Sequence, residues 1–169
     1  MGSSEVLADA YGRIREIVHR SVDGMSPEQL LARVEPQANS IAWLVWHLTR
    51  VQDDHISDVA GREQIWISQG WMERFALPFD ARATGYGHSA ADVAAVTVPS
   101  GELLTGYHDA VADATEEFVR GIGDADLDRI VDTSWNPPVT LGVRLVSVIS
   151  DNLQHAGQAA FVTGCVQRS

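Results

Sequence analysis

Apolar residues recur every three to four positions along four long segments of this chain, and this periodicity limits its fold more than any other feature. The spacing matches a helical turn of about 3.6 residues, so each segment gains one apolar face. The expected helices cover residues 4–22, 41–59, 100–121 and 140–163, the last of them ended by Gly164. No alternation typical of a strand extends beyond four or five residues. The pattern predicts an all-α four-helix bundle.

The connections between these segments are long enough to contain short extra helices. A capping Ser26 before a proline predicts a short helix over residues 27–34. Residues 64–75 have a helical pattern, and Ser89 can cap a further short turn. Residues 124–138 contain two adjacent prolines and are expected to be a loop.

Length and composition favour a single globular domain over residues 1–169, because no linker or repeat divides the chain. The net charge is −11, and all twelve basic residues are arginines scattered along the sequence. Such a chain repels phosphate groups, so we expect no nucleic-acid partner and no membrane. No apolar run approaches the roughly 18 residues of a membrane span. Cys165 is the only cysteine, which fits a cytoplasmic location without an intrachain disulfide.

Polar residues interrupt the apolar faces of two expected helices, and these positions are candidates for a functional site. His47 lies among large apolar neighbours in the expected second long helix, and Asp151 and His155 lie in the last one. Residues four apart on a helix share a face, so Asp151 and His155 can both bind one ion. His47 from a facing helix would complete three protein ligands, the arrangement of a catalytic zinc site with one open position. A hydrogen-bonded core histidine and a helical ion pair are the structural alternatives, and the spacing alone does not exclude them.

Asp54 and Arg144 are candidate substrate contacts. Asp54 lies on the His47 face of its helix but ~10 Å further along, too far to share an ion. It could meet a cationic or hydroxyl group of a substrate, although a solvated face is the favoured interpretation for Asp53 and Asp54. Arg144 could bind a substrate carboxylate, and a surface salt bridge is its alternative role.

The remaining histidines are weaker candidates. His55 is too far from His47 to share a metal ion, about 12 Å along the same helix. His19, His88 and His108 lie in polar or loop-like sequence and are expected to be exposed. The chain has no phosphate-binding glycine loop, no G-x-S-x-G and no C-x-x-C.

The order W-H-L-x-x-V-x-D at residues 46–53, followed by D-N-L-Q-H-A-G-Q at 151–158, resembles the DinB superfamily. More narrowly it is similar to the branch that contains the mycothiol S-transferases and the maleylpyruvate isomerase, and the resemblance extends over essentially the whole chain. It implies a DinB-like four-helix bundle in an up-down-down-up or related arrangement, which can form a homodimer. It also implies a metal ion held by His47, Asp151 and His155.

Many relatives have histidine at the first position of the last-helix pair, whereas this chain has Asp151, as the isomerase branch similarly has an acid. The resemblance implies a divalent metal, with zinc expected and nickel or another ion as alternatives. It further implies a thiol co-substrate such as mycothiol and a small electrophile, in a transferase that serves detoxification. Two neutral histidines and one carboxylate leave zinc a net charge of about +1, which favours a thiolate. An isomerase acting on maleylpyruvate and a non-catalytic metal-binding stress protein remain the alternative functions.

Overall fold

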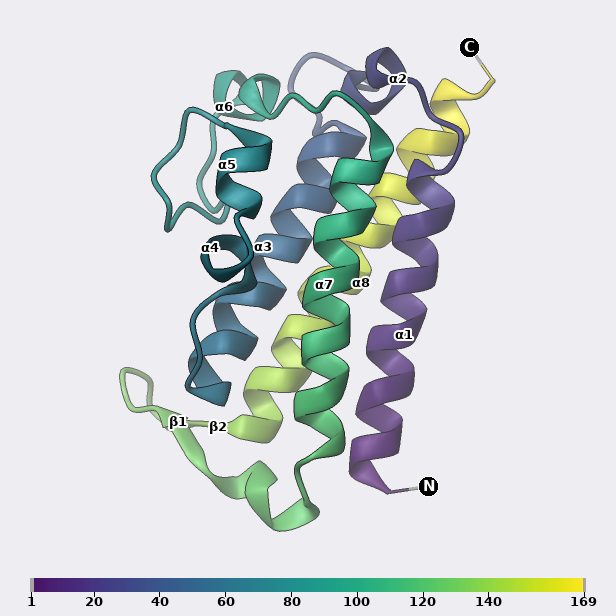
Figure 1. Ribbon diagram of the computed structural model, residues 1–169. Helices are drawn as coiled ribbons and strands as arrows, with labels where there is room; N and C mark the ends of the chain where they lie inside the picture. The colour runs from purple at the N-terminus through teal and green to yellow at the C-terminus, as the bar shows by residue number, and fades with distance from the viewer. Residues whose placement is uncertain (1, 169) are drawn as a thin grey trace.

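A computed structural model describes residues 2–168, and four long helices form its framework (Figure 1). The long helices are α1 (Ser3–Val22), α3 (Ile41–Ala60), α7 (Gly101–Arg120) and α8 (Leu141–Val166). Figure 1 shows α1 and α8 running in one direction and α3 and α7 in the other. Helix α3 packs on α7 and α8, and α1 packs on the same two helices from the opposite corner. The predicted all-α, DinB-like bundle in up-down-down-up order is confirmed.

Local capping explains where these helices begin and end. The Ser40 side chain accepts a hydrogen bond from the Trp43 amide at the start of α3, and Gly61 ends α3 in the left-handed conformation. Thr140 caps α8 in the same way. The prediction that Gly164 ends this last helix was wrong, because α8 continues to Val166. Packing against the bundle outweighs the weak helix preference of a single glycine.

The connections carry the short helices α2 (Pro27–Leu31), α4 (Ile65–Ser68), α5 (Trp71–Phe75) and α6 (Ala90–Ala95). Ser26 and Ser89 form the predicted caps of α2 and α6. The helix predicted over 64–75 is divided in two because Gly70 takes a left-handed conformation, with φ of 69°. Figure 1 shows α4, α5 and α6 on the outer side of α3, which they cover.

Residues 124–140 are more ordered than the predicted loop. They contain the 3-10 helix η1 (Asp124–Asp128) and two short antiparallel strands, β1 (Ile130–Asp132) and β2 (Val139–Thr140). Strands of two or three residues are too short to produce a recognisable alternation in the sequence. The β2 strand leads directly into α8, so the hairpin fixes where this helix begins.

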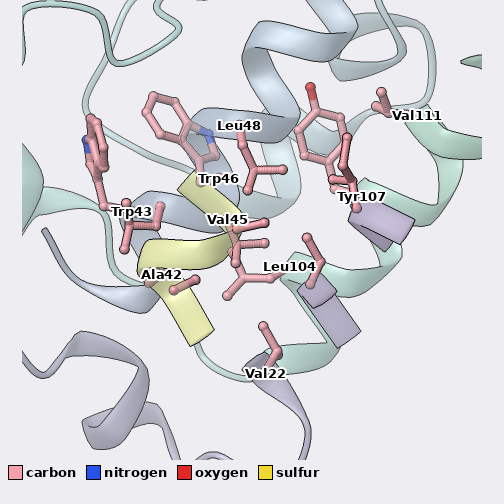
Figure 2. Close-up of a cluster of buried hydrophobic side chains, with 14 of the residues drawn as sticks. Val22, Ala42, Trp43, Val45, Trp46, Leu48, Leu104, Tyr107 and Val111 are labelled. Atoms are coloured by element: carbon pink, nitrogen blue, oxygen red, sulfur yellow. The ribbon is translucent and has the colours of Figure 1, made fainter. Parts of the chain in front are cut away.

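The apolar core lies between α3 and its neighbours, and Figure 2 shows Leu48 of α3 near Leu104 and Tyr107 of α7. Helix α3 is buried along most of its length, because the bundle covers one side and residues 62–98 cover the other. Several of its polar residues are therefore buried as well, namely Thr49, Arg50, Gln52, Asp53 and Ser57. Within residues 2–168, no helix is long and apolar enough to span a bilayer.

Candidate metal centre

The structure brings His47 of α3 together with Asp151 and His155 of α8, as the sequence predicts. One potential ligand atom from each residue lies within 4.8 Å of the other two. His155 Nε2 is 3.7 Å from Asp151 Oδ1, and the two imidazole centroids are 4.7 Å apart. A tetrahedral ion about 2.1 Å from each ligand atom would set these atoms about 3.4 Å apart, so only small side-chain movements are needed.

His47 lies on the buried side of this cluster. Its Nδ1 lies 2.5 Å from the Thr84 carbonyl oxygen. A carbonyl can only accept, so Nδ1 carries the hydrogen and Nε2 presents its lone pair. The Trp43 ring stacks on the imidazole at 4.5 Å, and only 5% of His47 is exposed. Burial lowers the pKa of His47, against the opposing effect of the Thr84 hydrogen bond, and this favours the neutral imidazole that a metal requires.

His155 is oriented by a residue one turn later on its own helix. The amide oxygen of Gln158 lies 2.9 Å from His155 Nδ1, which therefore donates the hydrogen and leaves Nε2 available. The edge of the Trp43 ring system meets His155 at 6.1 Å and 87°. Gln158 was not among the predicted site residues, although its spacing of three residues from a candidate ligand was a usable signal.

Asp151 supplies the observation that tests whether a cation fits here. Its Oδ2 is buried and has no hydrogen-bond partner among the described residues, although 38% of the side chain is exposed. A shielded carboxylate oxygen without a donor is costly, and a metal ion would satisfy it. Two imidazole nitrogens and one carboxylate oxygen converge, a ligand set that suits zinc and other divalent transition metals. The residues present fit such an ion, and the exposed side of Asp151 leaves access for a ligand.

The sequence of residues 6–164 matches the family model of the mycothiol S-transferases. The chain belongs to the mycothiol S-transferase family. It is also similar to a conserved protein from Enterococcus faecalis of known crystal structure, with 30% identity and a TM-score of 0.93. That similarity covers 100% of this chain and 99% of the other one. No curated protein shows significant similarity to this chain.

In this member of the mycothiol S-transferase family, His88 belongs to the aromatic wall beside the ligands. The Trp43 Nε1 donates to His88 Nδ1 at 3.1 Å, and the His88 ring stacks on Trp46 at 5.8 Å. Phe79 covers the ring from another side, with centroids 4.6 Å apart. The prediction that His88 is exposed was wrong, because the loop that carries it folds back on the aromatic face of α3.

The other two histidines expected on the surface differ from each other. His19 is exposed as predicted and lies 2.8 Å from Asp109. His108 is fully buried, and its Nδ1 lies 3.1 Å from the Thr49 hydroxyl. Burial lowers the pKa of His108 to about 4. The polar neighbours of His108 in the sequence were misleading, because residue 108 itself lies on the inward face of α7.

Asp53 and Asp54 have different environments, and the solvated face expected for both was wrong for Asp53. Asp53 is completely buried and accepts hydrogen bonds from the Ile65 and Trp66 amides and the Tyr107 hydroxyl. It thus fixes α4 against the bundle. Asp54 is half-buried and accepts from Gln64 at 2.7 Å. It lines a surface cavity of about 390 Å³ that contains none of the three candidate ligands.

The Arg144 side chain forms hydrogen bonds with two other side chains of the protein. Its guanidinium donates to Asp132 of β1 at 2.9 Å and to Nδ1 of His55 at 3.0 Å. Burial lowers the pKa of His55, as does the neighbouring positive charge of Arg144. The salt bridge considered from the sequence therefore exists and connects the hairpin to α8, while the hydrogen bond to His55 connects Arg144 to α3.

Proposed function

We propose that this chain is a divalent-metal-dependent mycothiol S-transferase. The observation that carries the proposal is the convergence of the His47 and His155 imidazoles and the Asp151 carboxylate within 4.8 Å, in a chain of the mycothiol S-transferase family. The second oxygen of that carboxylate, Oδ2, is buried and has no hydrogen-bond partner among the described residues. Zinc is the expected ion, with nickel as the main alternative. The substrates are a low-molecular-weight thiol and a small electrophile.

The three ligands give the centre the charge that this chemistry needs. Two neutral imidazoles and one carboxylate would leave a divalent ion with a net charge of about +1. When bound, the ion would supply the Lewis acidity that stabilises a thiolate near neutral pH. Thr84 and Gln158 hold the imidazoles in the metal-binding tautomer, and Trp43 shields His47 from water. The exposed side of Asp151 is where substrates would enter.

The proposed transfer is a nucleophilic substitution or addition at carbon. The thiol gives its proton to solvent, and the sulfur electron pair forms a new bond to the electrophilic carbon. In a substitution the leaving group departs with the electron pair of its bond to that carbon. In an addition the electron pair of the attacked π bond moves to the atom at its far end, which takes a proton from solvent. The ligand residues do not change their covalent state in this scheme.

We also propose Asp54 and Arg144 as substrate contacts on α3 and α8, seven residues from His47 and Asp151 respectively. A polar thiol or electrophile that extends ~10 Å from the ligands along these helices would reach them. Arg144 would bind a substrate carboxylate by exchanging it for Asp132.

A second copy of the chain is the proposed protein partner. The exposed residues of α8 carry no formal charge, in a chain whose net charge is −11. Those with large apolar side chains are Val143, Val146, Leu153 and Phe161. Two copies could approach along this face without the repulsion between acidic surfaces, so we propose a homodimer through α8.

The decisive experiment combines metal content with a thiol-dependence assay, using His155→Ala as the test variant and His19→Ala as its control. The parent and His19→Ala should retain about one divalent ion per chain and consume a generic electrophile only with thiol present. His155→Ala should lose most of the ion and the activity. Full metal occupancy in His155→Ala would contradict the site. Thiol-dependent loss of maleylpyruvate without a lasting conjugate would favour the isomerase, and metal without any turnover would favour a binding protein.

A further inference from the structure

The backbone of residues 81–85 is fixed to the outer side of α3 by two side chains of that helix. Arg50 Nε donates to the Ala83 carbonyl at 3.1 Å, and Arg50 Nη2 donates to the Ala81 carbonyl at 3.3 Å. His47 Nδ1 donates to the Thr84 carbonyl. Because Arg50 follows His47 by three residues, both side chains leave the same face of α3. Figure 1 shows this loop between α5 and α6, beside α3.

Arg50 is itself immobilised, so it can act as a rigid anchor for the loop. Its side chain is completely buried and makes further hydrogen bonds to the Tyr107 hydroxyl and the Gln64 amide oxygen, at 3.2 and 2.8 Å. The guanidinium lies 5.0 Å above the Trp66 ring centroid and 3.6 Å from Asp53. These contacts come from α3, α4, α7 and the residue before α4, and they leave the guanidinium little freedom to release the loop.

Gly85 permits the close approach of this loop to His47. It is buried and has φ of 97°, a conformation that favours glycine. A Cβ at this position would lie 2.7 Å from His47 Nδ1 and within 3.2 Å of both Trp43 and Trp46. Any side chain here would therefore push the loop, and with it the Thr84 carbonyl, away from the imidazole.

We propose that Arg50 and Gly85 are positioning residues that select the tautomer of His47. They hold the Thr84 carbonyl against Nδ1, so that Nδ1 carries the hydrogen and Nε2 faces Asp151 and His155. Free neutral histidine prefers the other tautomer, with the hydrogen on Nε2, which would block the ligand atom. The consequence for metal affinity rests on the proposed function, whereas the tautomer is a property of the metal-free chain.

The chain offers a matched pair of variants in the same loop. Gly87 also has a positive φ, 75°, but a Cβ there meets nothing within 4 Å. Gly85→Ala and Gly87→Ala therefore impose the same kind of backbone strain, and only Gly85→Ala also crowds His47. Circular dichroism of both variants checks that the bundle is retained.

The primary measurement is the ¹⁵N NMR spectrum of the imidazoles in the metal-free protein near pH 8, well above the ordinary histidine pKa of about 6.5. We expect His47 as the Nδ1–H tautomer in the parent and in Gly87→Ala, and a shift toward Nε2–H in Gly85→Ala. The Nε2–H tautomer in the parent, or an unchanged spectrum in folded Gly85→Ala, would overturn the proposal. If Gly85→Ala does not fold, Arg50→Lys is measured in its place. Lysine keeps the positive charge beside Asp53 but cannot reproduce the hydrogen bonds of the guanidinium to both loop carbonyls. An unchanged His47 tautomer in folded Arg50→Lys would also overturn the proposal.

Zinc affinity, measured by chelator competition, is the second readout. Gly85→Ala should bind zinc about 10- to 100-fold more weakly than the parent, as is typical when an outer hydrogen-bond partner of a metal ligand is lost. Gly87→Ala should remain close to the parent, and an equal loss in both variants would contradict selective positioning. A parent that binds no zinc refutes the proposed function, while the NMR result still decides the tautomer.

Discussion

Replacing Asp151 by asparagine should change metal affinity and metal-free stability in different ways. The amide keeps the size of the side chain and one oxygen, but it removes the charge and one strong ligand atom. Structural zinc sites with four ligands have apparent binding free energies of about 10–16 kcal/mol, or roughly 3 kcal/mol per ligand. We therefore expect zinc to bind about 100-fold more weakly to Asp151→Asn, with a matching loss of thiol-dependent turnover.

The metal-free protein should tolerate the same substitution. Asp151 Oδ2 accepts no hydrogen bond from the described residues, and the nearest imidazole nitrogen is 3.7 Å from Oδ1. That distance is longer than a hydrogen bond, so the substitution breaks no close contact of this carboxylate with the imidazole. Because the side chain is 38% exposed, we expect unfolding free energy to change by less than about 1 kcal/mol.

Chelator competition and urea unfolding of the metal-free protein measure the two effects separately. Asp151→His is the matched control, because it restores the ligand set that the resemblance implies for many relatives, and it should keep zinc while altering turnover. Zinc affinity in Asp151→Asn equal to that of the parent would show that Asp151 is not a ligand. A loss of several kcal/mol in the unfolding free energy of the metal-free protein would instead show that Asp151 stabilises the fold.

Three further predictions concern stability and assembly. His108 has a pKa of about 4 when folded and ~6.5 when unfolded, so the unfolded chain binds the extra proton between these values. The unfolding free energy should therefore fall as pH drops through this window, and His108 should account for about 3 kcal/mol of that fall. In urea unfolding, the unfolding free energy of His108→Gln should fall less over the same pH range. Asp53→Ala should lower the unfolding free energy by about 3–5 kcal/mol in the same assay, because it leaves the buried Arg50 without its charged partner. The exposed Asp9→Ala is the control, and an equally small loss in both variants would refute this prediction. Phe161→Asp, at a side chain that is 64% exposed, should convert a dimer to a monomer in light scattering, and a monomeric parent would contradict the proposed dimer.

The long helices and the candidate ligands could be predicted because their signals are local. Ser40 and Gly61 mark the ends of α3 through caps that depend only on nearby backbone groups. Asp151 and His155 share a face through helical spacing alone. The position of His47 opposite them needed only the expectation of a bundle and the resemblance to a known family.

The surroundings of the ligands could not be predicted in the same way. Asp53 was expected on a solvated face, and no role was predicted for Arg50. Both are buried because residues 62–98 cover that side of α3. The Thr84 carbonyl is a backbone group without a side-chain signature, so its bond to His47 depends on the path of the loop. Gly85 was one of several loop glycines, and only the nearby imidazole distinguishes it.

The two helices that carry the candidate ligands differ in how far they expose them to solvent. Helix α3 is buried on both sides, and it contributes the candidate ligand His47, whose ring is stacked on Trp43 and hydrogen-bonded to Thr84. Helix α8 contributes two candidate ligands at the edge of its buried face, where Asp151 remains partly open to solvent. A ligand fixed on the buried side would keep the geometry of a metal centre defined, and the exposed side of Asp151 would give substrates access to the ion. If this division is correct, substitutions in loop 81–85 should alter metal affinity first, and substitutions on the open side of α8 should alter turnover at unchanged metal content.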